Sequence, residues 1–186
     1  MEALFTSTAV VAIAEIGDKT QLLAMVLAAR FRRPLPIVAG ILVATLANHF
    51  LAALAGSLVA GLIDGAWFRY AVGISFLAMA AWTLVPDKLD DDDAPPASGG
   101  SVFWTTTVAF FIVEIGDKTQ VATIALGAQY GDAVLVTLGT TAGMMLANAP
   151  VVWLGDKLVN RVPMGAVRGV AAALFAGLGI WVLLSV

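Results

Sequence analysis

One heptapeptide, EIGDKTQ, occurs twice in the sequence, beginning at Glu15 and again at Glu114. Each copy places an aspartate three positions after its glutamate, at Asp18 and at Asp117. Both copies lie inside apolar sequence, and residues three positions apart share one face of a helix. The spacing therefore predicts that each pair of carboxylates converges on one point within an apolar helix. Acidic side chains at membrane depth usually face a protein interior or an aqueous path, and they mark routes for ions or protons.

The side chains around these acids offer oxygen atoms as donors to a metal. The predicted ligand set consists of Glu15, Asp18, Glu114 and Asp117, the motif residues Thr20, Gln21, Thr119 and Gln120, and the repeated asparagines Asn48 and Asn148. Such a set suits hard divalent cations such as Mg²⁺, Ca²⁺ and Mn²⁺. Copper and zinc would favour cysteine or several histidines, whereas this sequence has no cysteine and a single histidine.

The net charge of the two motifs predicts what the site exchanges. Four carboxylates contribute −4, and Lys19 and Lys118, which we assign to charge balance, bring the sum to −2. A dication would neutralise this charge, and an empty cluster in a medium of low dielectric should take up protons instead. Competition between protons and metal for the same carboxylates is the basis of cation/proton antiport. The prediction includes no permanently bound cofactor.

The composition indicates an integral membrane protein. Of 186 residues, 60% are hydrophobic and 12% are charged, whereas soluble domains average roughly 45–50% apolar and about 25% charged residues. A spanning helix needs about 20 mainly apolar residues. Six stretches of this kind can be drawn, at residues 3–29, 35–60, 67–85, 102–129, 133–158 and 165–185. We therefore expect an all-α membrane protein that contacts the lipid bilayer.

An acidic segment rich in Pro, Gly and Ser divides the chain at residues 86–101. Its composition is typical of a flexible, solvated linker. We therefore predict a first three-helix repeat at 1–85 and a second at 102–186. The run Asp90–Asp93 is interpreted as a solubilising loop, with a cation-attracting patch as the alternative.

Similarity between the two halves extends beyond the motif. With an offset of 99 or 100 residues, Asn48 matches Asn148, Phe76 matches Phe175, and Trp82 matches Trp181. Because each half contains three helices, an odd number, the halves should enter the membrane from opposite sides as an inverted repeat. Outside the motifs, seven Lys and Arg residues lie in or next to the loop between the first two spans, the linker, and the loop between the last two spans. These three segments would lie on one side of the membrane, and Arg69 alone would lie on the other. The positive-inside rule then predicts that both termini are non-cytoplasmic.

Simpler roles stay open for several of these residues. Each Asp–Lys pair could lock two helices together as a buried ion pair. For Asn48 and Asn148, metal ligation and interhelical hydrogen bonding are equally supported. His49, whose counterpart in the other half is Ala149, is interpreted as a packed residue, with a proton relay as the alternative. Met144 is expected to pack in the core or against lipid, and a soft metal ligand is the alternative.

The two copies of EIGDKT, one in each half, resemble the E-x-G-D-[KR]-[TS] signature of the Gdt-type cation/proton exchanger family. This family includes Golgi manganese/calcium transporters of eukaryotes and MneA-type manganese exporters of bacteria. The resemblance covers essentially the whole chain, and it implies transport of Mn²⁺ or Ca²⁺ coupled to protons at Glu15, Asp18, Glu114 and Asp117. The short chain is most similar to the bacterial members, which implies manganese export across the inner membrane.

Other function classes have less support in the sequence. A membrane-embedded enzyme that uses paired acids would be an alternative, but no Ser–His or Cys–His set is available for it. A small structural protein held together by buried ion pairs is a further alternative. No basic nucleic-acid footprint is present, and homo-oligomerisation stays open. We therefore expect a transporter rather than an enzyme.

Overall fold

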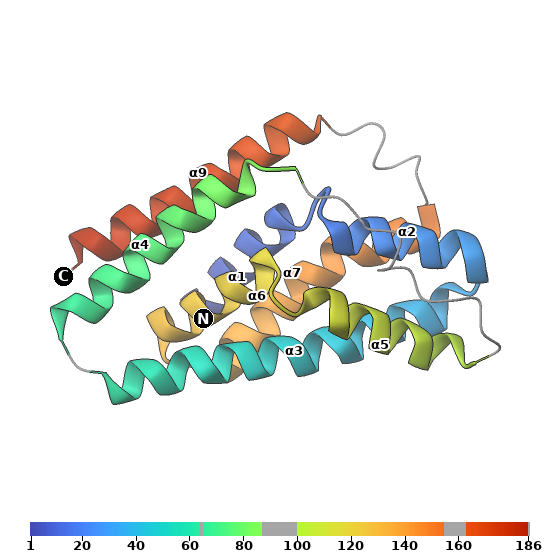
Figure 1. Cartoon of the computed structure of the whole chain (residues 1–186), viewed down its shortest axis with the longest axis horizontal. Coiled ribbons are helices and arrows are strands. Elements are labelled where there is room, and N and C mark those ends of the chain that lie inside the picture. Colours follow the sequence, from blue (N-terminus) through green and yellow to red (C-terminus); the bar gives the residue numbers. More distant parts are fainter. Residues whose placement is uncertain (64, 87–99, 155–162, 186) are drawn as a thin grey trace.

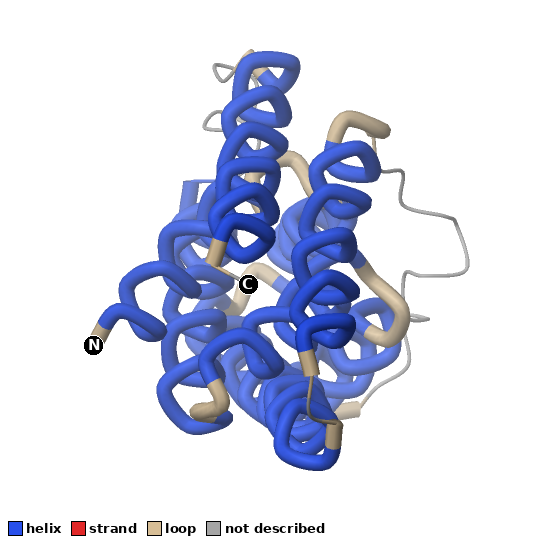
Figure 2. The backbone as a smooth tube through the Cα atoms, turned by 90° about the vertical axis from the view of Figure 1, so that its left-hand side faces the viewer, coloured by secondary structure: helices blue, strands red, loops and turns tan. Residues whose placement is uncertain are grey.

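The computed structural model describes residues 1–63, 65–86, 100–154 and 163–185, and these residues form helices and loops without a strand (Figure 2). The helices are α1 (Glu2–Ala14), α2 (Lys19–Phe31), α3 (Pro34–Leu62), α4 (Ala66–Thr83), α5 (Val102–Glu114), α6 (Lys118–Tyr130), α7 (Ala133–Leu154) and α9 (Met164–Leu184). The all-α prediction is confirmed for the described residues. The predicted linker lies mostly outside them, as do residues 155–158 of the fifth predicted span.

The first and fourth predicted spans differ from the structure. Each was expected to be one continuous helix, and each is two shorter helices that are broken at the EIGDKTQ motif. The break follows from the backbone at Gly17 and Gly116, whose φ angles of 83° and 78° are accessible mainly to glycine. Asp18 and Asp117 then adopt extended backbone at the N-caps of α2 and α6.

Three described helices, α3, α7 and α9, are each long and apolar enough to cross a membrane. The half-helices α1 and α5 are apolar but shorter. Many large apolar side chains on the outer surface are exposed, among them Leu51, Trp67 and Ile112, and a hydrocarbon environment would cover them. A membrane protein is therefore the consistent interpretation, as the composition predicts.

The long helices α3 and α7 pack against each other, and each carries the first helix of the other half. In the contacts of α3 with α5 and of α7 with α1, the helices approach closely at glycines 99 residues apart. A Cβ atom at Gly40 would lie 2.8 Å from the carbonyl oxygen of Phe103 in α5, and one at Gly139 would lie 2.5 Å from that of Leu4 in α1. Both pairs follow the same offset, so the two halves contribute equivalent contacts to the core.

The pair of α4 and α9 forms a second unit beside this core. These two helices lie side by side along α1 and α6, whereas α2 and α5 lie toward the other end of α3 (Figure 1). Among the described residues, α9 packs on α1 and α4 packs on α6, and neither makes comparable contact with α2 or α5. The pair therefore covers the half of the core that contains α1 and α6 and leaves the half that contains α2 and α5 uncovered.

The contact between α3 and α6 offers a test of this packing. A Cβ atom at Gly56 of α3 would overlap the carbonyl oxygen of Ile124 in α6, whereas a Cβ atom at Gly61 of α3 would meet no atom within 4 Å. We expect Gly56→Ala to lower the thermal midpoint in detergent, because overpacking typically costs about 1–3 kcal/mol. Gly61→Ala is the matched control and should not lower it. Equal midpoints for the two variants would contradict the α3–α6 packing.

Candidate metal centre

The two breaks bring four helix ends together near the middle of the molecule. Glu15 follows the last residue of α1, and Glu114 is the last residue of α5. The aspartates occupy the opposite ends of the breaks, at the starts of α2 and α6. The prediction that each Glu–Asp pair shares a helical face is therefore wrong, because the backbone between each glutamate and its aspartate is not helical. The pairs are presented by short non-helical segments instead.

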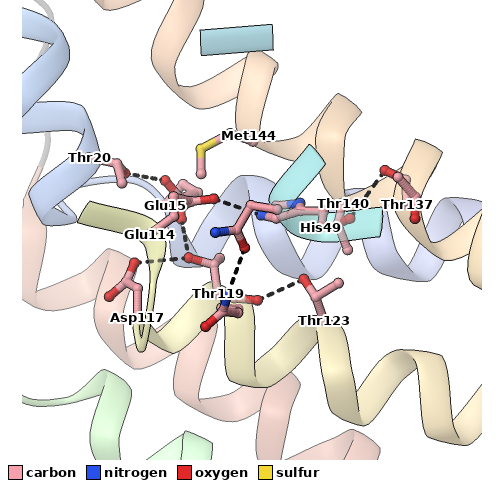
Figure 3. A network of polar contacts seen from close by, with 12 residues as sticks. Glu15, Thr20, His49, Glu114, Asp117, Thr119, Thr123, Thr137, Thr140 and Met144 are labelled. Atoms are coloured by element: carbon pink, nitrogen blue, oxygen red, sulfur yellow. Dashed lines mark hydrogen bonds and ion pairs between the residues drawn. The ribbon is translucent and has the colours of Figure 1, made fainter. Parts of the chain in front are cut away.

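Three carboxylates, those of Glu15, Glu114 and Asp117, meet at one point (Figure 3). Each side chain offers an oxygen atom within 4.8 Å of an oxygen atom of both others. Both glutamates are fully buried, and Asp117 is 3% exposed. The sequence predicted four converging acids, but Asp18, although also buried, is not among the three that meet. Both repeats contribute to the centre, but unequally.

Glu15 is held by hydrogen bonds from residues of both halves. The Oγ1 atom of Thr20 donates to Oε2 at 2.5 Å, and that of Thr119 donates to Oε1 at 2.7 Å. The Nδ2 atom of Asn148 in α7 also donates to Oε2, at 3.2 Å. Thr119 additionally lies 3.1 Å from Oδ2 of Asp117. Thus three of the predicted site residues surround one carboxylate and connect it to a second.

The motif glutamines brace the two breaks. The backbone N–H of Gly17 donates to Oε1 of Gln21 at 2.9 Å, and that of Gly116 donates to Oε1 of Gln120 at 2.8 Å. Their amide groups then donate across the core, from Gln21 to the carbonyl oxygen of Ala147 and from Gln120 to Oδ1 of Asn48. The sequence predicted four amide side chains as metal ligands, and the oxygen atoms of three of them, Gln21, Gln120 and Asn48, accept protein hydrogen bonds in this structure. Oδ1 of the fourth, Asn148, has no hydrogen-bond partner among the described residues.

The two lysines differ in their surroundings. The Nζ atom of Lys19 lies 3.5 Å from Oδ1 of Asp117, so this ion pair connects the first repeat to the second. The Nζ atom of Lys118 donates to the carbonyl oxygen of Val85, beyond the end of α4, at 2.9 Å. The geometry of Lys19 agrees with its predicted role in charge balance. Through its hydrogen bond to Val85, Lys118 also connects the second motif to the end of α4.

Two residues that the sequence assigned mainly to packing, His49 and Met144, also lie at the centre. His49 is fully buried on α3, and its Nε2 atom lies 3.0 Å from Oε2 of Glu114. Met144 is fully buried on α7, and its sulfur contacts Nδ2 of Asn148. His49 directly follows Asn48, but the absence of a second histidine at position 149 concealed its relevance. Core packing was expected for Met144 and is confirmed, although it packs at the edge of the site.

A small cavity approaches Glu15 from the α4–α9 pair. It is lined by Glu15 and Asp18 from the first break, Thr83 at the end of α4, Lys118, and Arg168 of α9. Acidic and basic groups therefore line one small cavity beside Glu15. Asp18 lines this cavity and is not among the three acids that meet, which suggests a different role from that of Asp117.

The unequal placement of the aspartates predicts unequal effects on metal binding. We expect Asp117→Asn to weaken Mn²⁺ binding by at least about tenfold more than Asp18→Asn, because only Asp117 lies with the two glutamates. The two substitutions occupy the same position of the same heptapeptide, so each is the matched control of the other. Titration of purified variants with Mn²⁺ would measure the difference. Equal losses of affinity would contradict the three-carboxylate centre.

The chain is similar to known proteins over nearly its whole length. The family model described as "Divalent cation/proton antiporter GDT1" matches residues 3–91 and 102–186. A Vibrio cholerae protein named "Putative manganese exporter" is 51% identical over 176 residues, covering 94% of this chain and 87% of its own length. "GDT1-like protein 4" of Oryza sativa is 26% identical over 204 residues, covering 96% of this chain and 72% of its own length. No solved structure is significantly similar to the chain.

Proposed function

We propose that this chain, which belongs to the divalent cation/proton antiporter family, exports Mn²⁺ across a membrane in exchange for protons. The observation that carries this proposal is the meeting of Glu15, Glu114 and Asp117, three buried carboxylates from both copies of one motif. The named relative from Vibrio cholerae favours manganese as the substrate. Ca²⁺ is the second candidate, because the same oxygen donors suit it.

The charge of the centre supports a divalent substrate. Three carboxylates contribute −3 and the paired Lys19 contributes +1, which leaves −2 for a cation to neutralise. Uncompensated charge in a medium of low dielectric is costly, so the carboxylates should hold either a metal ion or protons. Binding of one then expels the other, and this competition couples the two fluxes. The hydroxyl oxygens of Thr20 and Thr119, which hydrogen-bond to Glu15, would serve as further donors to the ion.

A purely structural role explains the centre less well. A lock between the repeats would require the cross-repeat ion pair of Lys19 and Asp117. It would not require Glu15 and Glu114 beside that pair, because two further buried acids add repulsion rather than attachment. Among the hydrogen bonds described at this site, none joins a hydroxyl group to His49, so a catalytic pair of hydroxyl and histidine has no support. The excess of acid is therefore better explained by a cation that comes and goes.

The packing supports a pair of inverted repeats with a way to alternate. Exchange of equivalent helices between the halves maps α1 onto α5, α6 onto α2, and α4 onto α9. The same exchange turns the observed contacts, α9 on α1 and α4 on α6, into contacts of α4 on α5 and α9 on α2. We propose that the transporter moves between these two arrangements. The α4–α9 pair would cover first one half of the core and then the other.

The charges at the loop ends support an orientation. Arg30, Arg32 and Arg33 lie at the junction of α2 and α3, on the side that the α4–α9 pair leaves uncovered. By the positive-inside rule this side is cytoplasmic and both termini are not, with the bacterial inner membrane as the proposed location. The uncovered half of the core then faces the cytoplasm, from which an exporter must load its substrate.

Reconstitution into liposomes would test the function. We expect Mn²⁺ movement in one direction across the vesicle membrane to drive proton movement in the other, and an imposed pH gradient to drive Mn²⁺ against its concentration gradient. Protein-free vesicles and vesicles treated with a protonophore are the controls. Mn²⁺ flux of the same rate with and without a proton gradient would contradict antiport, and the absence of any flux would contradict transport.

A further inference from the structure

We infer that His49 supplies a nitrogen donor to the metal centre and thereby selects a transition metal over Ca²⁺ and Mg²⁺. The inference rests on the proposed function and adds a residue that sets its specificity. The carboxylates alone provide only oxygen donors, which would suit Mg²⁺, Ca²⁺ and Mn²⁺ alike. Selection among these cations would therefore require a donor other than oxygen. His49, the single histidine of the sequence, can supply a nitrogen donor.

The position of His49 is that of a ligand rather than of a packing residue. Its side chain is fully buried and its Nε2 atom lies 3.0 Å from Oε2 of Glu114, which is itself fully buried. Adjacent ligands of one octahedral metal ion stand at about this separation, because each is roughly 2.1 Å from the metal. Neither ring nitrogen makes a hydrogen bond of good geometry to another described residue. A buried imidazole with both nitrogens in this condition is directed at the site and is available to a metal.

The helix that carries His49 fixes it in this place. The preceding residue, Asn48, accepts a hydrogen bond from Gln120, which in turn braces the break before α6. α3 is thus attached to the segment that presents Glu114 and Asp117. Figure 3 shows the imidazole beside Glu114 and on the opposite side of the carboxylates from Thr20. The imidazole therefore lies next to Glu114, the glutamate that the second motif contributes to the centre.

The chemistry of imidazole gives this position its consequence. Imidazole nitrogen binds first-row transition metals well, whereas Ca²⁺ and Mg²⁺ take oxygen ligands almost exclusively. One nitrogen among carboxylates would favour Mn²⁺ over Ca²⁺ without creating the high affinity for zinc or copper that several histidines or cysteines would confer. The remaining oxygens would still allow the ion to be released, as a transported substrate must be.

Because the sequence contains one histidine, electron spin-echo spectroscopy can test the inference without isotopic labelling. The full-length protein, purified without a polyhistidine tag, would be loaded with Mn²⁺. We expect ¹⁴N couplings typical of a bound imidazole in the wild type and their absence in His49→Gln. A wild-type spectrum without imidazole couplings would overturn the inference, and this measurement requires no variant to fold.

Competition experiments provide the functional measurement. We expect His49→Gln to reduce the preference for Mn²⁺ over Ca²⁺ by about tenfold or more, mainly through weaker Mn²⁺ binding. Phe50→Leu is the control, because Phe50 follows His49 on α3 but is 42% exposed and lies away from the buried centre. It should keep both the preference and the spectrum. An unchanged preference in His49→Gln, or an equal loss in Phe50→Leu, would overturn the inference.

The failure of this inference is distinguishable from the failure of the proposed function. If wild-type protein binds and transports Mn²⁺ but shows no imidazole coupling, only the role of His49 is wrong. If the wild type neither binds nor transports any of the three cations, the proposed function is wrong and the inference is overturned with it.

Discussion

We expect Glu15→Gln to abolish Mn²⁺ binding and Mn²⁺ transport while the protein stays folded. Glu15 is fully buried, and it is the acid to which the hydroxyl groups of Thr20 and Thr119 and the amide of Asn148 all donate. Replacing its carboxylate removes one unit of negative charge and one oxygen donor from the centre. A loss of about 100-fold or more in metal affinity should follow, because even indirect supports of a metal site contribute about 10–100-fold.

The folded state should tolerate this substitution. Glutamine has the shape of glutamate, and the hydroxyl groups of Thr20 and Thr119 can accept a hydrogen bond as readily as they donate one. Loss of one charge also reduces repulsion with Glu114 and Asp117. The thermal midpoint without metal should therefore stay close to that of the wild type, which separates this prediction from the structural alternative of a buried ion-pair lock.

Metal-dependent thermal stability would measure the effect. Wild-type protein at a free Mn²⁺ concentration 100 times the dissociation constant should gain about 2.7 kcal/mol, and Glu15→Gln should gain almost nothing at the same concentration. Glu2→Gln is the matched control, because Glu2 is an exposed acid in the first turn of the same helix α1. Unchanged stabilisation in Glu15→Gln would remove Glu15 from the site. Unfolding of Glu15→Gln without metal would favour the lock.

The helical class of the described residues and the three acids of the candidate centre could be predicted from composition and repetition. The apolar stretches correspond to helices, and the two EIGDKTQ copies supply the three acids that meet. The helix breaks could not be predicted by hydropathy, because an apolar window looks the same whether its backbone is continuous or not. They depend on positive φ angles at Gly17 and Gly116 and on glutamine side chains that accept from those glycines.

The unequal roles of Asp18 and Asp117 also lie beyond the sequence. Identical heptapeptides predict identical roles, and any difference between them must come from the arrangement of the whole molecule. Within the described part of the chain, the α4–α9 pair packs mainly on α1 and α6, so the surroundings of the two breaks differ. A single conformation of the proposed inverted repeat would break the symmetry that the repeated sequence implies. The alternate arrangement of α4 and α9 would exchange the surroundings of the two aspartates.

If α4 and α9 alternate between the two arrangements, a covalent bridge between α1 and α9 should stop transport without preventing metal binding. Ala9 of α1 and Ala173 of α9 are both exposed and line the same groove between these helices. Because the native chain has no cysteine, Ala9→Cys with Ala173→Cys introduces the only two thiols. A short thiol-specific cross-linker would then hold the α4–α9 pair against α1, in the arrangement in which the site faces the proposed cytoplasmic side.

We expect the cross-linked double variant to lose Mn²⁺ flux in liposomes and to keep Mn²⁺-dependent thermal stabilisation, because the three carboxylates do not lie in the bridged groove. With a cleavable reagent, reduction should restore the flux. Each single-cysteine variant treated with the same reagent is the matched control and should transport normally. Full transport by the bridged protein would show that α9 need not leave α1, and alternation of the α4–α9 pair between the two halves of the core would then be wrong.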